Sequence, residues 1–129
     1  MEAKKVKVLL VDDETDFIQT MSFWLKSKGY DVTSALNGQI AVEAVKKETP
    51  DIIFMDLNMP VMDGVQALKQ IREFNKDLPV IMISAFVDDQ RMLEARNYGF
   101  SGVFYKGKDF QESLALLEAA LRTHRKLKK

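Results

Sequence analysis

The sequence contains no cysteine and a single histidine, His124. Without cysteine there is no disulfide framework, no thiolate metal site and no cysteine nucleophile. One histidine cannot form a zinc-binding cluster, and it argues against a histidine-based catalytic triad. No apolar run approaches the roughly 20 residues that a helix needs to span a bilayer. The stretch Val8–Val11 is also too short for a signal-peptide core. We therefore expect a cytoplasmic protein that does not contact a membrane.

The 129 residues suit one domain, residues 1–129, with a substantial hydrophobic core. The formal net charge is zero, but the charge is unevenly distributed. Residues 122–129 hold five of the 19 basic residues and no acid, so 14 basic and 19 acidic residues remain before them, a net charge of −5. This basic C-terminal tail can contact nucleic acid or an acidic partner, but we favour a solvated helix end, where cations suit the helix dipole. No direct binding of nucleic acid is predicted.

Short apolar runs alternate with amphipathic stretches along the whole chain, which indicates five strands and five helices. The strands are predicted at Lys5–Val11, Tyr30–Ala35, Ile52–Asp56, Val80–Ile83 and Gly102–Tyr105. Helix faces are marked by apolar residues at helical spacing, among them Phe17, Met21, Trp24 and Leu25, then Ile40, Ala41, Ala44 and Val45, then Val65, Leu68 and Ile71, then Met92, Leu93 and Ala95, and finally Leu114, Leu117 and Leu121. Short connections imply parallel strands with right-handed helical crossovers. The predicted fold is a three-layer α/β domain around a five-stranded parallel sheet.

Polar residues follow the predicted strands at the ends where parallel sheets bind ligands. Asp12 and Asp13 follow the first strand, and Asp56 ends the third. Ser84 follows the fourth strand and Lys106 the fifth. Singly, an aspartate or a serine there would be read as a helix cap and the lysine as a surface residue. Together, on one rim of the sheet, they indicate a functional site.

Three neighbouring carboxylates repel one another, and a divalent cation would relieve that repulsion. Oxygen ligands of this kind favour Mg²⁺, with Mn²⁺ as the alternative, over zinc or copper. Magnesium in proteins often combines one or two carboxylates with water and a phosphate oxygen. The set of acids with a lysine therefore indicates phosphoryl chemistry, in which cations neutralise charge on the transferred group.

The chain resembles the receiver domain of bacterial two-component response regulators, in particular chemotaxis-regulator-like receivers. The resemblance rests on four segments, which are Val8-Leu9-Leu10-Val11-Asp12-Asp13, Asp51-Ile52-Ile53-Phe54-Met55-Asp56-Leu57-Asn58-Met59-Pro60-Val61-Met62-Asp63-Gly64, Pro79-Val80-Ile81-Met82-Ile83-Ser84-Ala85 and Lys106. It implies a flavodoxin-like (βα)5 fold with strand order 2-1-3-4-5.

The resemblance also implies roles for the acidic residues. Asp56 would be the phosphoacceptor, taking a phosphoryl group from a phosphohistidine. Asp13, Asp56 and the backbone carbonyl of Asn58 would bind Mg²⁺ directly, and Asp12 would act on the cation through water. Ser84 would hydrogen-bond the phosphoryl group.

The remaining implied roles concern Lys106 and the partners. Lys106 would pair with the phosphoryl group. The phosphoryl donor would be a sensor histidine kinase or a phosphotransfer protein. A downstream protein would bind the face formed by the fourth helix, the fifth strand and the last helix. The domain would catalyse its own phosphorylation and dephosphorylation without being a multiple-turnover enzyme.

Two positions depart from the family pattern, and two others are expected to affect the lifetime of the phosphorylated state. Val103 stands where family members usually carry the aromatic switch residue, and Tyr105, on the same side of an ideal strand, is the candidate replacement. Gly107 replaces the proline that usually follows the lysine, often through a cis bond. A cis bond before a non-proline residue costs about 2.5–4 kcal/mol, so we expect a different loop path. The resemblance implies that Asn58 and Phe86 flank the approach of water and tune the lifetime of the phosphorylated state. Phe86 would hinder the attack of water, or would instead point into a partner-binding surface.

Three alternatives have less support. A haloacid-dehalogenase-like phosphatase would carry a second catalytic aspartate at the position of Asn58, and the chain has no cap domain. A nucleotide hydrolase would carry a G-x-x-x-x-G-K-[ST] loop, and this sequence has none. A receiver-like domain that only binds partners would not need Asp13, Asp56, Ser84 and Lys106 together.

Overall fold

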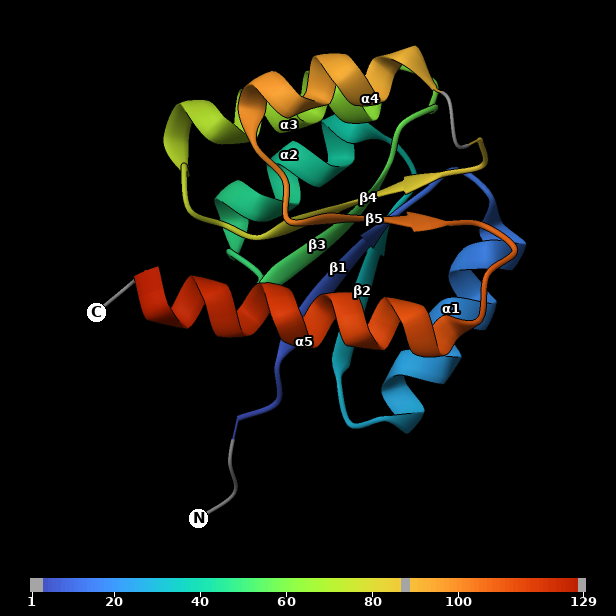
Figure 1. The fold of residues 1–129 in the computed structure, drawn as a ribbon. Coiled ribbons are helices and arrows are strands. Elements are labelled where there is room, and N and C mark those ends of the chain that lie inside the picture. Colours follow the sequence, from blue (N-terminus) through green and yellow to red (C-terminus); the bar gives the residue numbers. More distant parts are fainter. Residues whose placement is uncertain (1–3, 87–88, 128–129) are drawn as a thin grey trace.

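The computed structural model describes residues 4–86 and 89–127, with side chains up to His124. Five strands alternate with five helices (Figure 1). The strands are β1 (Lys7–Val11), β2 (Asp31–Ala35), β3 (Ile52–Asp56), β4 (Val80–Ser84) and β5 (Gly102–Tyr105). The helices are α1 (Thr15–Ser27), α2 (Gly38–Lys47), α3 (Gly64–Phe74), α4 (Gln90–Ala95) with the short 3₁₀ turn η1 (Arg96–Tyr98), and α5 (Phe110–Leu127).

All strand pairs are parallel, and the strand order is β2-β1-β3-β4-β5. This confirms the predicted sheet. Figure 1 shows α1 and α5 on one face of the sheet and α2, α3 and α4 on the other. The carboxyl ends of β1 and β3 lie side by side, because Val11 is in register with Met55. The register of β4 with β5 likewise sets Ser84 opposite Tyr105, directly before Lys106.

Two hydrophobic clusters cover the two faces of the sheet, because successive strand residues point to opposite faces. On β1, Leu9 and Val11 join the cluster under α2, α3 and α4, whereas Val8 and Leu10 join the one under α1 and α5. Every residue of β3 and β4 is buried, as expected for the centre of a parallel sheet. The central strands therefore give the carboxyl-end rim a fixed base.

The predicted boundaries and helix faces need small corrections. The first strand begins at Lys7 rather than Lys5, and the second at Asp31 rather than Tyr30. Ile40 and Leu93 were expected on buried helix faces, but 44% and 62% of their surfaces are exposed. α2 instead buries Ala41, Val42 and Val45, so Ile40 falls at the flank of the packed face. α4 has only six residues, and Leu93 lies on its outer side.

The predicted basic tail lies only partly within the described residues. The helix α5 extends to Leu127, and Arg122 is exposed, in agreement with a solvated helix end. The side chains from Arg125 onward and residues 128–129 lie outside the described part. Among the helices described, none has the length and apolar character needed to cross a lipid bilayer.

Candidate functional site

The site is an acidic cluster at the adjacent ends of β1 and β3. Asp12 follows β1, and Asp56 is the last residue of β3. Carboxylate oxygens of Asp12, Asp13 and Asp56 all lie within 4.8 Å of one another. Asp12 and Asp56 are buried, whereas Asp13 is exposed to solvent. The structure thus brings together the three acids that the sequence placed on one rim.

Backbone contacts fix Asp12 at the bottom of the cluster. Its N–H donates to the carbonyl of Ala35 at 3.1 Å, continuing the β1–β2 ladder by one residue. Its Oδ1 accepts a hydrogen bond from the backbone N–H of Glu14 at 2.9 Å. The other oxygen, Oδ2, is buried and faces the ammonium of Lys106, 2.9 Å away.

Close backbone packing behind β3 holds Asp56. The N–H of Leu57 donates to the carbonyl of Ile83 at 3.2 Å, and the N–H of Gly64 donates to the carbonyl of Leu57 at 3.0 Å. A Cβ atom on Gly64 would lie 2.1 Å from the carbonyl oxygen of Asp56, so only glycine fits there. Asp63 then caps α3 through a reciprocal pair of bonds with Gln66.

Lys106 completes the site from β5. Its Nζ lies 2.9 Å from Oδ2 of Asp12 and 3.8 Å from Oδ2 of Asp56. It also forms an ion pair with Glu14. The ring of Phe17 lies beneath the ammonium, 4.9 Å from centroid to Nζ. The lysine side chain is 15% exposed, so it is largely enclosed by these groups.

Burial and mutual repulsion raise the carboxyl pKa values. Burial, and then the charge of Asp12, raise the pKa of Asp56 to about 7. Burial also raises the pKa of Asp12, although the Glu14 N–H and Lys106 partly oppose this. Burial alone would lower the pKa of Lys106, but its bonds to the acids raise it overall. One lysine therefore does not balance the acids, and the site favours a further cation.

The donor set fits Mg²⁺. The three clustered side chains offer only carboxylate oxygens, and the exposed one, Asp13, leaves the cluster open to solvent. A hard divalent cation prefers such ligands and keeps part of its water shell. Asn58, whose carbonyl was predicted as a ligand, lies two residues after Asp56 at the same rim and is exposed. Its side-chain amide donates to Asp89 at 3.3 Å and is therefore engaged away from the cluster.

Ser84 is buried at the rim, but its hydroxyl is engaged by its own loop. Its Oγ donates to the carbonyl of Phe86 at 2.6 Å and accepts from the N–H of Phe86 at 3.1 Å. The hydroxyl therefore acts as a loop cap in this state. The ring of Phe86 is 69% exposed.

The predicted switch positions lie along β5. Val103 is partly buried and packs against the cluster under α2, α3 and α4. Tyr105 is also partly buried, and Phe104 between them packs on the opposite face, as the strand alternation predicts. No peptide bond within the described residues is cis, and Gly107 has a φ of 92°, a conformation that favours glycine.

Sequence reasoning missed Glu14 as part of the site and assigned Phe17 only to a helix face. Glu14 directly follows Asp12 and Asp13, so the local sequence predicts only that it lies with other acids at the start of a helix. Its contact with Lys106 spans 92 positions in sequence, which no local pattern reveals.

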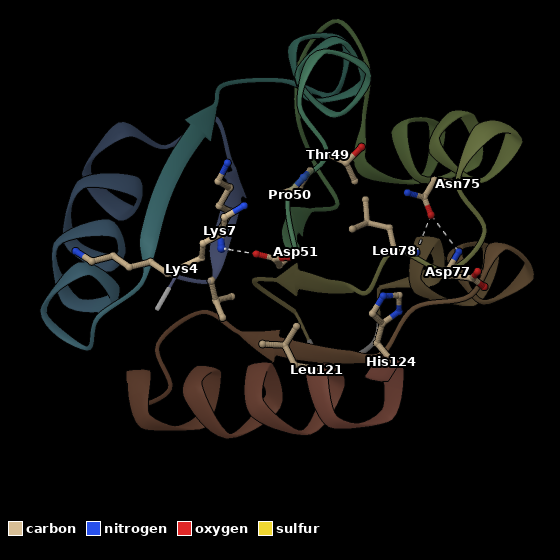
Figure 2. A pocket seen from close by; sticks show the side chains of 12 residues that line it. Lys4, Lys7, Thr49, Pro50, Asp51, Asn75, Asp77, Leu78, Leu121 and His124 are labelled. Carbon is tan, nitrogen blue, oxygen red and sulfur yellow. Dashed lines mark hydrogen bonds between the residues drawn. The ribbon is translucent and has the colours of Figure 1, made fainter. Parts of the chain in front are cut away.

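A cavity of about 770 Å³ lies at the opposite end of the sheet (Figure 2). Its lining includes Lys7, Asp51 and Asn75. Asp51 accepts from the backbone of Lys7, and Asn75 accepts from the backbone of Asp77 and Leu78. These polar groups are thus used to hold the chain in place, and the chemistry collects at the other rim.

Comparisons with known proteins agree on one family. Residues 8–118 match the response regulator receiver domain family. The chain is 33% identical over 124 residues to the transcriptional regulatory protein ZraR of Klebsiella oxytoca, covering 95% of this chain but 28% of that protein. The chain therefore spans little more than a quarter of the length of this relative.

Solved structures agree with the fold. The N-terminal domain of a response regulator/sensory box/GGDEF protein from Carboxydothermus hydrogenoformans is similar, with a TM-score of 0.89 and 31% identity over 95% of this chain and 99% of that one. A CheY-like receiver domain protein from Methanospirillum hungatei has a TM-score of 0.90 over 95% of this chain and 98% of that one. Its identity is only 20%, so that likeness concerns the fold alone.

Proposed function

The chain belongs to the response regulator receiver domain family, and from this premise we propose that it accepts a phosphoryl group on Asp56. The observation that carries the proposal is the position of Asp56. Its carboxylate is buried beside two further acids and lies 3.8 Å from the ammonium of Lys106. A structural aspartate gains nothing from such surroundings, because burial and a neighbouring acid both oppose its charge.

The proposed step is a phosphoryl transfer between two nucleophiles. An oxygen of the ionised Asp56 carboxylate attacks phosphorus, and the bond from phosphorus to the histidine nitrogen of the donor breaks. The electron pair of that bond stays with the imidazole, which takes up a proton from solvent. The product is an acyl phosphate on Asp56.

The residues of this chain orient and neutralise the group. Lys106 pairs with a phosphoryl oxygen, and Ser84 donates to another after its hydroxyl leaves the backbone of Phe86. Asp13, Asp56 and the carbonyl of Asn58 would hold Mg²⁺ or Mn²⁺ directly, with Asp12 acting through water. The cation would supply positive charge to the phosphoryl oxygens. Asn58 and Phe86 flank the approach of the hydrolytic water and set how long the acyl phosphate survives.

The proposed output is a change at the face formed by α4, β5 and α5. The Ser84 carbonyl accepts from the N–H of Lys106, the residue after β5, at 2.9 Å. The Ser84 hydroxyl bonds the backbone of Phe86 in the loop between β4 and α4. A shift of the Ser84 hydroxyl toward the phosphoryl group would therefore act on the loop that leads to α4. Val103 has no ring to reorient, so an aromatic response is confined to Tyr105 or is absent. The donor would be a sensor histidine kinase or a phosphotransfer protein, the acceptor of the signal would be a protein, and the site of action would be the cytoplasm.

The test is phosphorylation by acetyl phosphate with Mg²⁺, followed by intact mass. We expect the mass to rise by one phosphoryl group in the parent and in Asp51→Asn, a matched control at the other end of β3. Asp56→Asn should give no increase, and removal of Mg²⁺ by a chelator should stop the reaction. Labelling of Asp56→Asn at the rate of the parent would overturn the assignment.

A further inference from the structure

Glu14 occupies the N-cap position of α1 without acting as a cap. Glutamate is not among the residues favoured there, which bond their side chains to the N–H groups of the first turn. The Glu14 side chain makes no capping bond to the described backbone, and its carboxylate instead binds Lys106. The backbone of Glu14 is held in place because its N–H donates to Oδ1 of Asp12. The acid is thus held at the mouth of the site.

Lys106 is consequently committed to two acids other than Asp56. An ammonium has three N–H donors. It contacts the Glu14 carboxylate and Oδ2 of Asp12, whereas the oxygen of Asp56 is 3.8 Å away, beyond hydrogen-bond distance. The Phe17 ring below the ammonium limits where it can move. This lysine is therefore bound to Asp12 and Glu14 rather than to Asp56.

We propose that Glu14 is a positioning residue that competes with the phosphoryl group for Lys106 and so slows phosphorylation of Asp56. The inference rests on the proposed function and adds a control on the rate of phosphorylation. For Lys106 to pair with a phosphoryl oxygen, it must give up its contact with Glu14. The Glu14 carboxylate also adds negative charge at the entrance used by an anionic donor.

The size of the effect follows from the exposure of Glu14. Its side chain is 63% exposed, so water and salt screen its charge. Ion pairs of such exposure contribute less than about 1 kcal/mol, which corresponds to a rate change of about two- to fivefold. Glu14→Gln keeps the shape of the side chain and removes the charge. It should raise the phosphorylation rate by that factor.

The experiment compares parent, Glu14→Gln, Glu14→Asp and Asp16→Asn under acetyl phosphate with saturating Mg²⁺, with intact mass as the readout. Asp16 is the matched control, since it is an exposed acid in the first turn of the same helix. We expect Glu14→Gln to react faster and Asp16→Asn to react like the parent. The advantage of Glu14→Gln should shrink as salt is raised. Affinity for beryllofluoride, a phosphoryl mimic, should rise in parallel.

The outcomes separate this inference from the proposed function. If the parent is phosphorylated on Asp56 and Glu14→Gln reacts no faster than Asp16→Asn, the competition is disproved and the proposed function stands. If the parent is not phosphorylated at all, both are wrong. Glu14→Asp keeps the charge but shortens the side chain, so an intermediate rate supports competition for Lys106. If the phosphorylation rate of Glu14→Gln exceeds that of the parent by the same factor at every salt concentration, electrostatic competition for Lys106 is disproved.

Discussion

The two halves of the carboxyl-end rim are held in place in different ways. The acidic half consists of Asp12, Asp13 and Asp56, after β1 and β3, and the responding half consists of Ser84, Phe86 and Lys106, after β4 and β5. In the acidic half, backbone hydrogen bonds and a glycine that packs against Asp56 fix the buried acids. In the responding half, Ser84 bonds to an exposed loop residue and Lys106 to an exposed acid.

Two of the helices that follow, α3 after the acidic half and α4 after the responding half, differ in the same way. α3 has 11 residues and begins with a complete capping box at Asp63. α4 has six residues and continues into the 3₁₀ turn η1, and its Leu93 faces solvent. Short elements with few buried contacts open at low free energy, and moving parts are drawn from them. The comparison indicates that the acidic half is a fixed platform and that the responding half is built to rearrange.

The largest effect on stability is expected from a methyl group added at Gly64, behind the acidic half. In Gly64→Ala, the new Cβ would lie 2.1 Å from the Asp56 carbonyl oxygen, and the backbone must shift. We expect a loss of about 4 kcal/mol in the free energy of unfolding and weaker phosphorylation. Gly107→Ala, in the responding half, meets no atom within 4 Å and carries only the strain of its φ of 92°. Its expected cost is about 1–2 kcal/mol. Equal losses in urea unfolding would contradict the comparison.

The next effect is the pH dependence of stability that Asp56 contributes. Its pKa is about 7 in the folded protein, against about 3.9 in an unfolded chain. Between these values the folded state binds more protons, so this group lowers stability as pH rises from about 4 to about 7. Above pH 7 without Mg²⁺, the buried carboxylate costs about 4 kcal/mol relative to a neutral group.

Asp56→Asn should therefore be more stable than the parent at pH 8 in a chelating buffer and should differ little from it near pH 4. The measurement is urea unfolding of both proteins across this range. Their difference reports Asp56 together with its interactions with Asp12 and Lys106, because the more distant titrating groups are common to both. A parent that becomes relatively more stable with rising pH would show that the Asp56 carboxylate is not held under repulsion.

The third prediction concerns Arg72, whose hydrogen bonds limit the mobility of the responding half. Arg72 of α3 donates to the carbonyls of Tyr98, Gly99 and Asn75 at 2.9–3.1 Å, and so ties the end of η1 to α3. Arg72→Ala should cost about 2 kcal/mol, because three carbonyls lose their donor. Arg72→Lys should recover only part of this, since an ammonium lacks the planar fork of the guanidinium. Full recovery in urea unfolding would contradict this role of the fork.

The positions of the rim residues were the easier feature to predict from sequence. Strand ends place Asp12, Asp56, Ser84 and Lys106 on one rim by topology alone, and the buried strands are readable as apolar runs. The sheet order came from the resemblance, and the structure confirms it. These features depend on backbone direction and burial, which local sequence encodes.

Side-chain partners in the responding half were not predictable in this way. That the Ser84 hydroxyl bonds the backbone of Phe86, and that Lys106 binds Glu14, depends on rotamers and on chain segments far apart in sequence. The exposure of Leu93 follows from the shortness of α4, which its apolar spacing did not reveal. The sequence therefore predicts the location of the site better than it predicts the hydrogen-bond partners of Ser84 and Lys106 in the unphosphorylated protein.

The smallest effect concerns the lifetime of the acyl phosphate and the ring of Phe86. Both backbone groups of Phe86 hold Ser84 in the resting state. Phe86→Ala keeps these bonds and removes only the ring. We propose that Asn58 orients the hydrolytic water, and that the apolar ring of Phe86 offers this water no hydrogen bond and hinders its attack on the bond from Asp56 to phosphorus.

We expect phosphorylated Phe86→Ala to lose its phosphoryl group about threefold faster than the parent, because a barrier change of 1.4 kcal/mol would give about tenfold and an exposed ring contributes less. Phe23→Ala is the control, since Phe23 is 78% exposed and lies in the second half of α1, away from the rim where that helix begins. The decay of the phosphorylated mass at saturating Mg²⁺ measures both rates. An unchanged decay in Phe86→Ala would remove the ring from the hydrolytic path and leave the lifetime to Asn58 and the loop around Ser84.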